Sequence, residues 1–293
     1  MEQTILVIGG TGILGEPVSR CLKESGFGVR IMTRDLQKAR RIFDNSFELF
    51  GENPMDTTCL EEAMDGCQGV HISLPSEVEQ QVAKLVAAKA PVHGIRRISY
   101  ISGATVASEH RWFEMVNRKF LAEQAIRESN IPYTIFCPTW VMEILPQFIN
   151  QGRAAVFGKQ PHPYHWVAAL DLARMVVTAY MLEGAANKRY VVLGPEAISM
   201  QEALRRYCSA FHPEIKEVSS MPFWLVKLLG TLTSNQELKS AGEMMAYFEK
   251  IGESSSNHSD DYCLLGPPSI TLDAWLERKK SETTWQQGIL TSV

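Results

Sequence analysis

The sequence predicts an α/β protein built on a doubly wound parallel sheet, with a smaller C-terminal region. Short β-branched runs alternate with helical patterns through the first half, and a glycine-rich turn follows the first run. The predicted strands are residues 4–8, 29–33, 47–50, 69–74, 98–102 and 133–137. The predicted helices are residues 16–25, 36–43, 58–64, 77–90 and 113–129. Strands that alternate with helices of this length form βαβ crossovers, so helices should cover both faces of the sheet.

The elements after Pro138 are less regular. Residues 152–165 are rich in Gly, Pro and His and are predicted to form a loop. Asp171 is placed to cap a helix that runs to Leu182, and residues 190–193 form one more strand. We expect this helix and strand to return to the first sheet.

The C-terminal third carries fewer signals. Ser199 and Glu202 have the spacing of a capping box and should open a helix. Residues 254–261 are polar enough for an exposed or mobile loop, and residues 272–277 predict a terminal helix. The predicted domains are 1–155, with 166–195 returning to its sheet, and a smaller substrate-side region over 196–293.

Composition excludes several classes of protein. The formal net charge of −4 and a pI near 6.0 give no electrostatic case for nucleic acid, which calls for a concentrated basic surface. The 6 cysteines form no CxxC pair and no His–Cys cluster of zinc spacing, so we expect no metal site and a cytoplasmic, reducing compartment. No apolar run approaches the roughly 20 residues that span a bilayer, so we expect no membrane partner.

A glycine turn, defined here as residues 9–15 (GGTGILG), follows the first predicted strand and opens a helix. Its three spaced glycines permit a tight turn, close approach of the backbone to a pyrophosphate, and close contact of helix and strand. The phosphates then meet N–H groups at the positive end of the helix. This context predicts a Rossmann-type dinucleotide site; a glycine turn without a ligand is the alternative. The expected contacts are Gly9, Thr11, Gly12, Ile13, Leu14 and Gly15.

The end of the second predicted strand selects between cofactors. An acidic residue there binds the ribose hydroxyls of NAD, whereas a nearby Arg accommodates the 2′-phosphate of NADP. In this chain Thr33 stands at the acidic position, Arg34 follows it, and Lys38 lies one helical turn further on. We therefore expect NADP(H), because a guanidinium fork matches phosphate geometry. Asp35 leaves NAD open as an alternative, since its carboxylate comes only one residue later.

Ligands of open α/β sheets sit outside the carboxyl ends of the strands. Leu74, Pro75 and Pro138 lie at such ends and are expected to contact the cofactor. Ser102 lies at another and is expected to donate a hydrogen bond to a substrate. A small residue at a strand end is often only part of a turn, which is the alternative for Ser102.

Taken together, these motifs resemble the NmrA-like branch, an atypical branch of the short-chain dehydrogenase/reductase superfamily, over about residues 4–195. Further marks of this resemblance are Asp56, Lys119, Glu123, residues 131–138, 140–143 and 166–173, and Gly194-Pro195. The resemblance implies a Rossmann-type fold, an NADP(H) cofactor, and either a reductase or a regulatory protein. Two departures concern Glu52, where members usually have Asp, and Cys137, where they often have Arg.

The largest departure concerns the catalytic tyrosine. Typical members of the superfamily carry Tyr-x-x-x-Lys, in which the phenol transfers a proton and the lysine binds the nicotinamide ribose. Here the corresponding positions hold Met115 and Lys119, with Glu123 one turn later on the same helical face. A thioether cannot donate a proton, so alcohol or ketone chemistry through that tyrosine is excluded.

Three functions remain open. The first is a reductase in which Lys119 holds the ribose or acts directly as the acid or base. The second is a non-catalytic NADP(H)-binding redox sensor or assembly factor, which the missing tyrosine favours. The third is an NDP-sugar epimerase or dehydratase, which is disfavoured because such relatives generally rely on the tyrosine.

A substitute proton donor is sought in residues 162–166 (HPYHW). Tyr164 or His165 would face the substrate there, whereas the alternative is a polar loop anchored by Trp166. The candidates for an apolar wall of the pocket are Trp140, Met142, Phe223 and Trp224, although each is more often ordinary core. If they line the pocket, the substrate is a small apolar or aromatic molecule. A homo-oligomer is left open.

Overall fold

The chain divides into two compact units. The structure is a computed structural model that describes residues 3–253 and 262–290. Among these, the first unit holds residues 3–138, 169–192 and 262–267, and the second holds 139–168, 193–253 and 268–290. The segment 254–261, predicted to be an exposed or mobile loop, lies outside the described residues.

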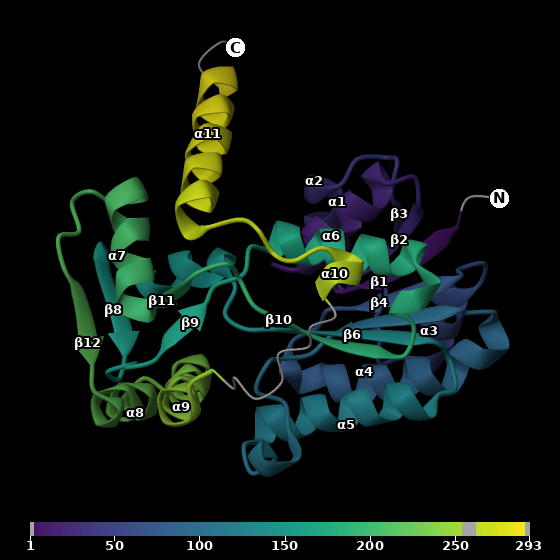
Figure 1. Cartoon of the computed structure of the whole chain (residues 1–293), viewed down its shortest axis with the longest axis horizontal. Helices are drawn as coiled ribbons and strands as arrows, with labels where there is room; N and C mark the ends of the chain where they lie inside the picture. Colours follow the sequence, from purple (N-terminus) through teal and green to yellow (C-terminus); the bar gives the residue numbers. More distant parts are fainter. Residues whose placement is uncertain (1–2, 254–261, 291–293) are drawn as a thin grey trace. The chain divides into compact units, whose positions relative to one another are not determined.

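A seven-stranded parallel sheet forms the centre of the first unit, with the strand order β10-β6-β5-β4-β1-β2-β3 (Figure 1). Its strands are β1 (Thr4–Ile8), β2 (Gly28–Met32), β3 (Glu48–Phe50), β4 (Gly69–Ile72), β5 (Arg97–Ile101), β6 (Tyr133–Pro138) and β10 (Lys188–Val192). This confirms the predicted doubly wound α/β fold, including the return of the 188–192 segment to the sheet. The order reverses between β1 and β4, so their carboxyl ends flank the crevice at which such sheets bind ligands.

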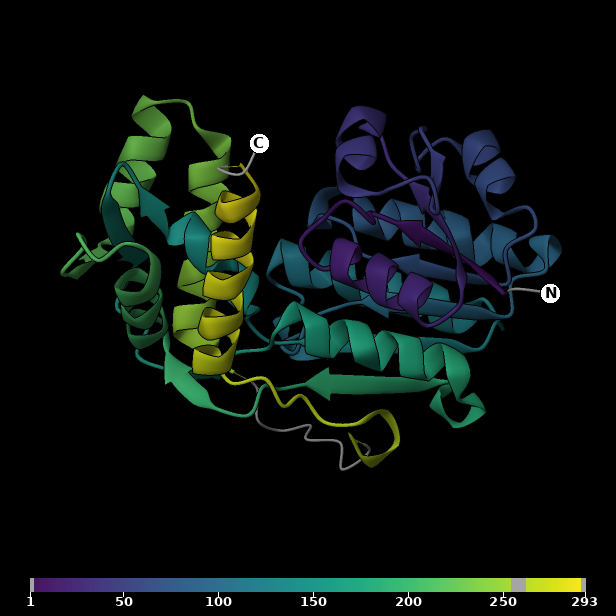
Figure 2. The ribbon, with the colours of Figure 1, turned by 90° about the horizontal axis from the view of Figure 1, so that it is seen from above.

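Helices cover both faces of this sheet. Helices α1 (Gly15–Glu24) and α6 (Ala169–Met181) lie side by side on one face, and α4 (Ser76–Lys89) and α5 (Glu114–Glu128) pack together on the other (Figures 1 and 2). The remaining helices of the unit are α2 (Leu36–Ile42), α3 (Thr57–Met64), α10 (Tyr262–Leu265) and the short 3₁₀ helices η1 (Ala90–His93), η2 (Ser108–His110) and η4 (Glu183–Ala185). Because both faces are covered, the central strands read as continuous apolar runs: Ile5, Leu6, Val7 and Ile8 of β1 are all fully buried.

The described part of the second unit combines short strands with four α-helices and one 3₁₀ helix. Its strands are β7 (Ile149–Asn150), β8 (Arg153–Phe157) and β12 (Val218–Met221) in one sheet, and β9 (Pro163–His165) paired with β11 (Ala197–Ser199) in another. Its helices are α7 (Met200–Phe211), α8 (Phe223–Leu232), α9 (Gln236–Ile251), α11 (Leu272–Leu290) and the 3₁₀ helix η3 (Met142–Phe148). Its core includes Trp140, Tyr164, Trp166 and Trp275. No helix in the described part of the chain is long and apolar enough to cross a membrane.

Two sequence predictions differ from this arrangement. Residues 152–165 do not form a loop: they contribute β8 and β9, in which Ala154, Val156 and Tyr164 alternate inward. The division also comes earlier than residue 155, because residues 139–168 supply Trp140 and Met142 to the core of the second unit. The reason is the same in both cases: β8 and β9 pair with strands about 35 to 65 residues further along, as in the registers Ile198–Tyr164 and Val218–Ala154.

Candidate functional site

The glycine turn leaves no room for side chains. Gly9 has a φ of +87°, and a Cβ at this position would lie 2.0 Å from the carbonyl oxygen of Ser73, just after β4. A Cβ on Gly15 would lie 2.1 Å from the carbonyl oxygen of Gly9. The chain therefore turns sharply at the end of β1, and α1 begins directly against it. No side chain caps the start of α1, so the turn is a main-chain cradle that fits the pyrophosphate of a dinucleotide.

The other residues of the turn are accessible. Gly12 is exposed and its amide donates to the carbonyl oxygen of Gly9 at 3.0 Å, which closes the turn. Thr11 and Leu14 are half-buried, whereas Ile13 keeps 42% of its surface exposed. An exposed isoleucine beside a phosphate cradle is available to a ligand.

Arg34 and Lys38 lie where the adenosine end of a dinucleotide is expected. Both are exposed, and neither forms an ion pair with any described residue. Asp35 is committed to the fold instead, because its carboxylate accepts from the Lys38 amide at 2.8 Å and caps α2. Thr33 is buried, and its hydroxyl accepts from the Asp35 amide at 3.2 Å. Among the residues that the structure describes at this strand end, only positively charged side chains are left without a structural role.

The strand-end residues fall into two groups. Leu74 lies beside the glycine turn, since its Cδ2 would be 3.2 Å from a Cβ on Gly9, and Pro75 directly precedes α4. Pro138 ends β6 further along the sheet, where its carbonyl oxygen accepts from the Ala104 amide at 3.0 Å. The structure therefore brings Leu74 to the turn and Pro138 to the loop that follows β5.

Lys119 sits at the carboxyl end of β5. Its Nζ lies 2.7 Å from Glu79 Oε2 and 3.4 Å from the carbonyl oxygen of Ile101, the last residue of that strand. The Lys119 side chain is 16% exposed, whereas Glu79 on α4 is fully buried. The phenol of Tyr100 donates to the same Glu79 oxygen at 2.9 Å. Lys119 is therefore not a free surface lysine: its ammonium is fixed next to Ser102.

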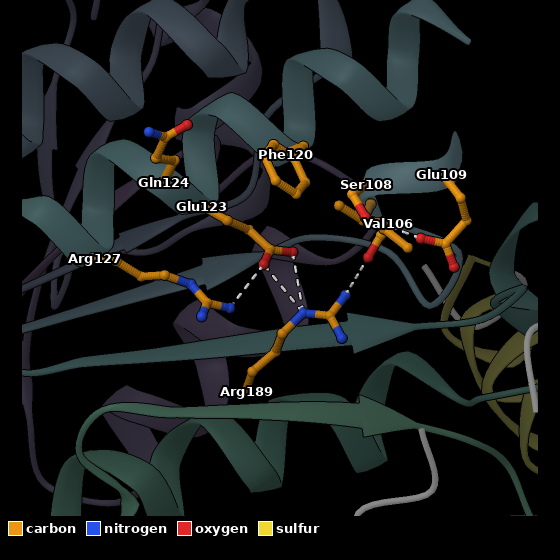
Figure 3. Close-up of a pocket in the computed structure, with 9 residues that line it drawn as sticks. Val106, Ser108, Glu109, Phe120, Glu123, Gln124, Arg127 and Arg189 are labelled. Carbon is orange, nitrogen blue, oxygen red and sulfur yellow. Dashed lines mark hydrogen bonds and ion pairs between the residues drawn. The ribbon is translucent and has the colours of Figure 1, made fainter. Parts of the chain in front are cut away.

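A second buried carboxylate, Glu123 on α5, accepts a hydrogen bond from Ser102 and lies between Arg127 and Arg189, as Figure 3 shows for the two arginines. The Ser102 hydroxyl donates to Glu123 Oε1 at 2.5 Å, and Arg189 Nε and Arg127 Nη2 each lie 3.1 Å from Oε2. Arg189 also donates to the carbonyl oxygen of Val106 at 2.9 Å and so ties the loop after β5 to β10. Glu123, Arg127 and Arg189 line a hollow of about 670 Å³ together with Val106, and the three charged side chains pair with one another there.

This network changes the role predicted for Ser102. A carboxylate held between two guanidinium groups is only an acceptor, so the single hydroxyl proton of Ser102 is committed to Glu123. Toward a ligand, Ser102 offers oxygen lone pairs. Its proton is therefore not available to a substrate in this arrangement, whereas the sequence suggested that Ser102 donates to one.

The fold and these positions agree with the comparison to known proteins. A sequence profile of the NmrA-like family matches residues 1–276. The chain belongs to the NmrA-like family. This confirms the resemblance drawn from the glycine turn, Arg34 and Lys119.

Individual NmrA-like relatives differ in their named roles. The chain is 26% identical to an NAD(P)H azoreductase of Xenophilus azovorans over 226 residues, which cover 73% of this chain and 76% of the relative. It is 23% identical to the photosystem II assembly factor Ycf39 of Guillardia theta over 299 residues, 94% of this chain and 93% of the relative. The crystal structure of Citrobacter sp. triphenylmethane reductase complexed with NADP(H) superposes with a TM-score of 0.74 at 21% identity, covering 94% of this chain and 99% of that one. The structural likeness shows a shared fold.

Tyr164 lies in the core of the second unit. It is fully buried, and its hydroxyl donates to the carbonyl oxygen of Phe248 at 3.1 Å. Burial, together with the nearby carboxylates Glu253 and Glu249, raises the pKa of the Tyr164 phenol well above its usual value. This geometry favours the structural alternative for Tyr164. His165 likewise pairs with Glu253, whose carboxylate contacts both its ring and its amide.

The four apolar-wall candidates separate by burial. Trp140 and Met142 are core residues of the second unit, exposed by 8% and 1%, and Phe223 packs against that core. Trp224 on α8 is 67% exposed. The interpretation as ordinary core therefore fits Trp140, Met142 and Phe223, and it does not fit Trp224.

Sequence reasoning missed three residues of the site: Glu79, Tyr100 and Arg189. Glu79 did carry a signal, because it lies on the same face of its helix as Val82 and Ala83, in an otherwise apolar stripe. A lone carboxylate in such a stripe requires a buried partner. Tyr100 and Arg189 carried none, since each reads as an ordinary strand residue.

Proposed function

We propose that this chain binds NADP(H) and transfers hydride to a small apolar or aromatic acceptor, with Lys119 as the proton donor in place of the missing tyrosine. The observation that carries the proposal is the ammonium of Lys119, fixed at the carboxyl end of β5 within reach of the loop that begins at Ser102. The main-chain cradle at Gly9 and the unpaired Arg34 support the choice of cofactor.

The reaction consumes one hydride and one proton for each acceptor reduced. Bound NADPH would supply the hydride, and the acceptor then requires a proton to complete its two-electron reduction. Lys119 donates that proton from Nζ and regains one from solvent through the exposed part of its side chain. Ser102 contributes a hydrogen-bond acceptor that orients the ligand. Met115, one turn before Lys119, takes no part in proton transfer.

The named relatives support a reductase. The azoreductase, the triphenylmethane reductase and an NADPH-dependent quinone oxidoreductase of Escherichia coli act, by their names, on small aromatic or conjugated molecules. The last two were solved with NADP(H) or NADPH bound. Azo dyes and quinones are the first acceptors to test, because their two-electron reduction takes up a proton as well as a hydride.

The test compares Lys119→Met with the wild-type chain in NADPH oxidation assays on these acceptors. We expect kcat to fall by about 10²–10⁴-fold, the usual contribution of a general acid. Lys84→Met is the matched control, because Lys84 is an exposed lysine on α4 and should leave kcat unchanged. Turnover by Lys119→Met at the wild-type rate would exclude Lys119 as the proton donor.

A second function, a non-catalytic NADP(H)-binding assembly or regulatory protein, is favoured by two observations. Met115 removes the usual proton donor, and the assembly factor Ycf39 of Guillardia theta matches 94% of this chain. Under this alternative the wild-type chain binds NADPH tightly but oxidises it with none of the acceptors. If the chain binds NADPH but shows no turnover, the reductase function is excluded and the regulatory function is supported. If it binds neither NADPH nor NADH, both functions are excluded.

A further inference from the structure

Glu79 is the buried charged group closest to the proposed proton donor. We infer that Glu79, itself oriented by Tyr100, is the positioning residue that holds the Lys119 ammonium in place and in its charged form. The inference rests on the proposed function, because it assigns the residue that prepares Lys119 for proton donation.

Stability alone does not account for a carboxylate at position 79. It is fully buried on the apolar face of α4, and its Oε1 has no hydrogen-bond partner among the described residues. An unsatisfied buried acceptor destabilises a fold, and a buried ion pair often stabilises a fold no better than apolar residues of similar volume. Burial accordingly raises the pKa of Glu79, while the charge of Lys119 and the hydrogen bonds from Lys119 and Tyr100 oppose that rise.

Two donors converge on one oxygen of Glu79. Tyr100 and Lys119 both donate to Glu79 Oε2, at 2.9 and 2.7 Å. Tyr100 is fully buried and Glu79 raises its pKa further, so its phenol keeps its proton and acts as a fixed donor. The position of Oε2 is thus set from β5, and Oε2 in turn sets the position of Nζ.

The Lys119 ammonium keeps one hydrogen-bond donor for a ligand. An ammonium has three N–H donors. One N–H of Lys119 is directed at Glu79, and a second makes a long contact of 3.4 Å with the carbonyl oxygen of Ile101. The third has no hydrogen-bond partner among the described residues, although the ammonium also lies 5.7 Å from the centre of the Tyr100 ring, and the side chain as a whole is 16% exposed. A lysine held in this way can donate to a ligand without first losing rotamer freedom.

Other ionisable groups also surround Lys119. They are Glu79 from α4, Tyr100 from β5, Cys137 from β6 and Glu123 from α5, while the exposed Glu77 acts on Glu79. Glu123 is already paired with Arg127 and Arg189. Burial raises the pKa of Cys137 to about 12, so its thiol is neutral near pH 7. Glu79 is therefore the carboxylate that lies directly against the Lys119 ammonium.

The test measures the protonation of Lys119 directly. Competitive acetylation at a series of pH values, read by mass spectrometry of the peptide that contains Lys119, gives the pH midpoint at which the amine becomes reactive. In Glu79→Gln we expect this midpoint to move down by about one pH unit, which is about tenfold more neutral amine at a given pH. A change in accessibility alone alters the plateau of reactivity and leaves the midpoint in place.

Glu61→Gln is the matched control. Glu61 on α3 pairs with Lys89 on α4, so its loss breaks another inter-helix ion pair of the same unit, and the Lys119 midpoint should stay unchanged. Tyr100→Phe removes only the hydroxyl that orients Glu79, and we expect a smaller downward shift. If Glu79→Gln does not fold, the Lys119 midpoint in Tyr100→Phe tests the inference instead.

An unchanged Lys119 midpoint in Glu79→Gln, or in Tyr100→Phe where only that variant folds, overturns the inference. The labelling uses the chain without a dinucleotide, so its outcome does not depend on turnover. If the chain is a reductase, the alkaline limb of its kcat profile should move by the same amount in Glu79→Gln. If the midpoint shifts but the chain reduces no acceptor, the inference about Glu79 holds and the proposed reductase reaction is excluded.

Discussion

At the scale of single residues, His71 on β4 shows how the first unit handles a buried titratable group. None of its surface is exposed, and its Nδ1 lies 2.7 Å from the Ser99 hydroxyl, which is itself 2.9 Å from the Tyr180 hydroxyl. Its Nε2 has no partner within the described residues. Burial lowers the pKa of His71 to about 3, so the folded chain keeps the imidazole neutral at any ordinary pH.

This burial predicts a loss of stability in mild acid. The unfolded chain takes up a proton on His71 below about pH 6.5, but the folded chain does not until about pH 3, so stability falls as pH falls through this window. Between pH 6.5 and pH 5 the single group contributes a loss of about 2 kcal/mol. Urea unfolding at both values should show this difference for the wild type and not for His71→Asn, whose amide can still reach Ser99. Parallel pH dependence in the two chains would show that His71 is not buried neutral.

The residues that sequence analysis found and missed differ in a physical way. Arg34 and Lys119 were predicted because each stands at a fixed distance from a motif that the sequence displays. Glu79 and Tyr100 act on Lys119 from α4 and β5, 40 and 19 residues away in the chain, and only the packing of these elements brings them together. The hydroxyl of Ser102 illustrates the same limit, because the direction of its proton depends on Glu123.

At the scale of elements, helix α2 links the cap residue Asp35 to cofactor choice. The Asp35 carboxylate accepts from the Lys38 amide, and Arg34 directly precedes the cap. If capping is its whole role, Asp35→Asn keeps the cap and should leave the affinity for NADPH and NADH within about twofold. Asp35→Ala loses a cap of about 1 kcal/mol and should weaken NADPH binding several-fold, because Arg34 and Lys38 lose their fixed backbone. Fluorescence titration measures both; weaker NADH binding by Asp35→Asn would instead assign Asp35 to the ribose.

The first unit could be predicted element by element, whereas in the second unit the sequence predicted the starts of α7 and α11 but not the strands. From β1 to α5 each predicted bound lies within two residues of the observed one, because buried parallel strands and amphipathic helices leave strong local patterns. Strand β9 pairs with β11, 32 to 36 residues further along, and the five-residue β8 pairs along its length with β12, 64 residues further along, in addition to its short hairpin with β7. Even the capping box at α7 is only half formed: Ser199 accepts from the Glu202 amide, but the Glu202 side chain pairs with Arg206.

At the scale of the whole molecule, the two units divide the predicted chemistry unequally. The glycine turn, Arg34, Lys38, Leu74, Pro138 and Lys119 all belong to the first unit. The second unit has its own core, and Tyr164 is one of its buried members. The predicted role of residues 196–293 in shaping a substrate pocket stays a prediction. Cofactor binding should therefore act on the stability of the first unit.

A ligand that binds the folded chain raises its stability by RT ln(1 + [L]/Kd), about 2.7 kcal/mol at 100 times Kd. We expect NADPH at this concentration to raise the melting temperature by roughly 5 °C or more, and NADH at the same concentration to raise it less.

Arg34→Ser removes an exposed guanidinium that has no partner among the described residues, so the chain without ligand should melt at the wild-type temperature. With NADPH present the variant should lose about 1.4 kcal/mol of the stabilisation, equivalent to about tenfold weaker binding, while its response to NADH stays unchanged. Arg40→Ser, at an exposed arginine of α2, is the control and should behave as the wild type. Differential scanning calorimetry separates these cases, because a loss of response to both dinucleotides in Arg34→Ser would indicate a damaged fold, and an undiminished response to NADPH would place the 2′-phosphate away from Arg34.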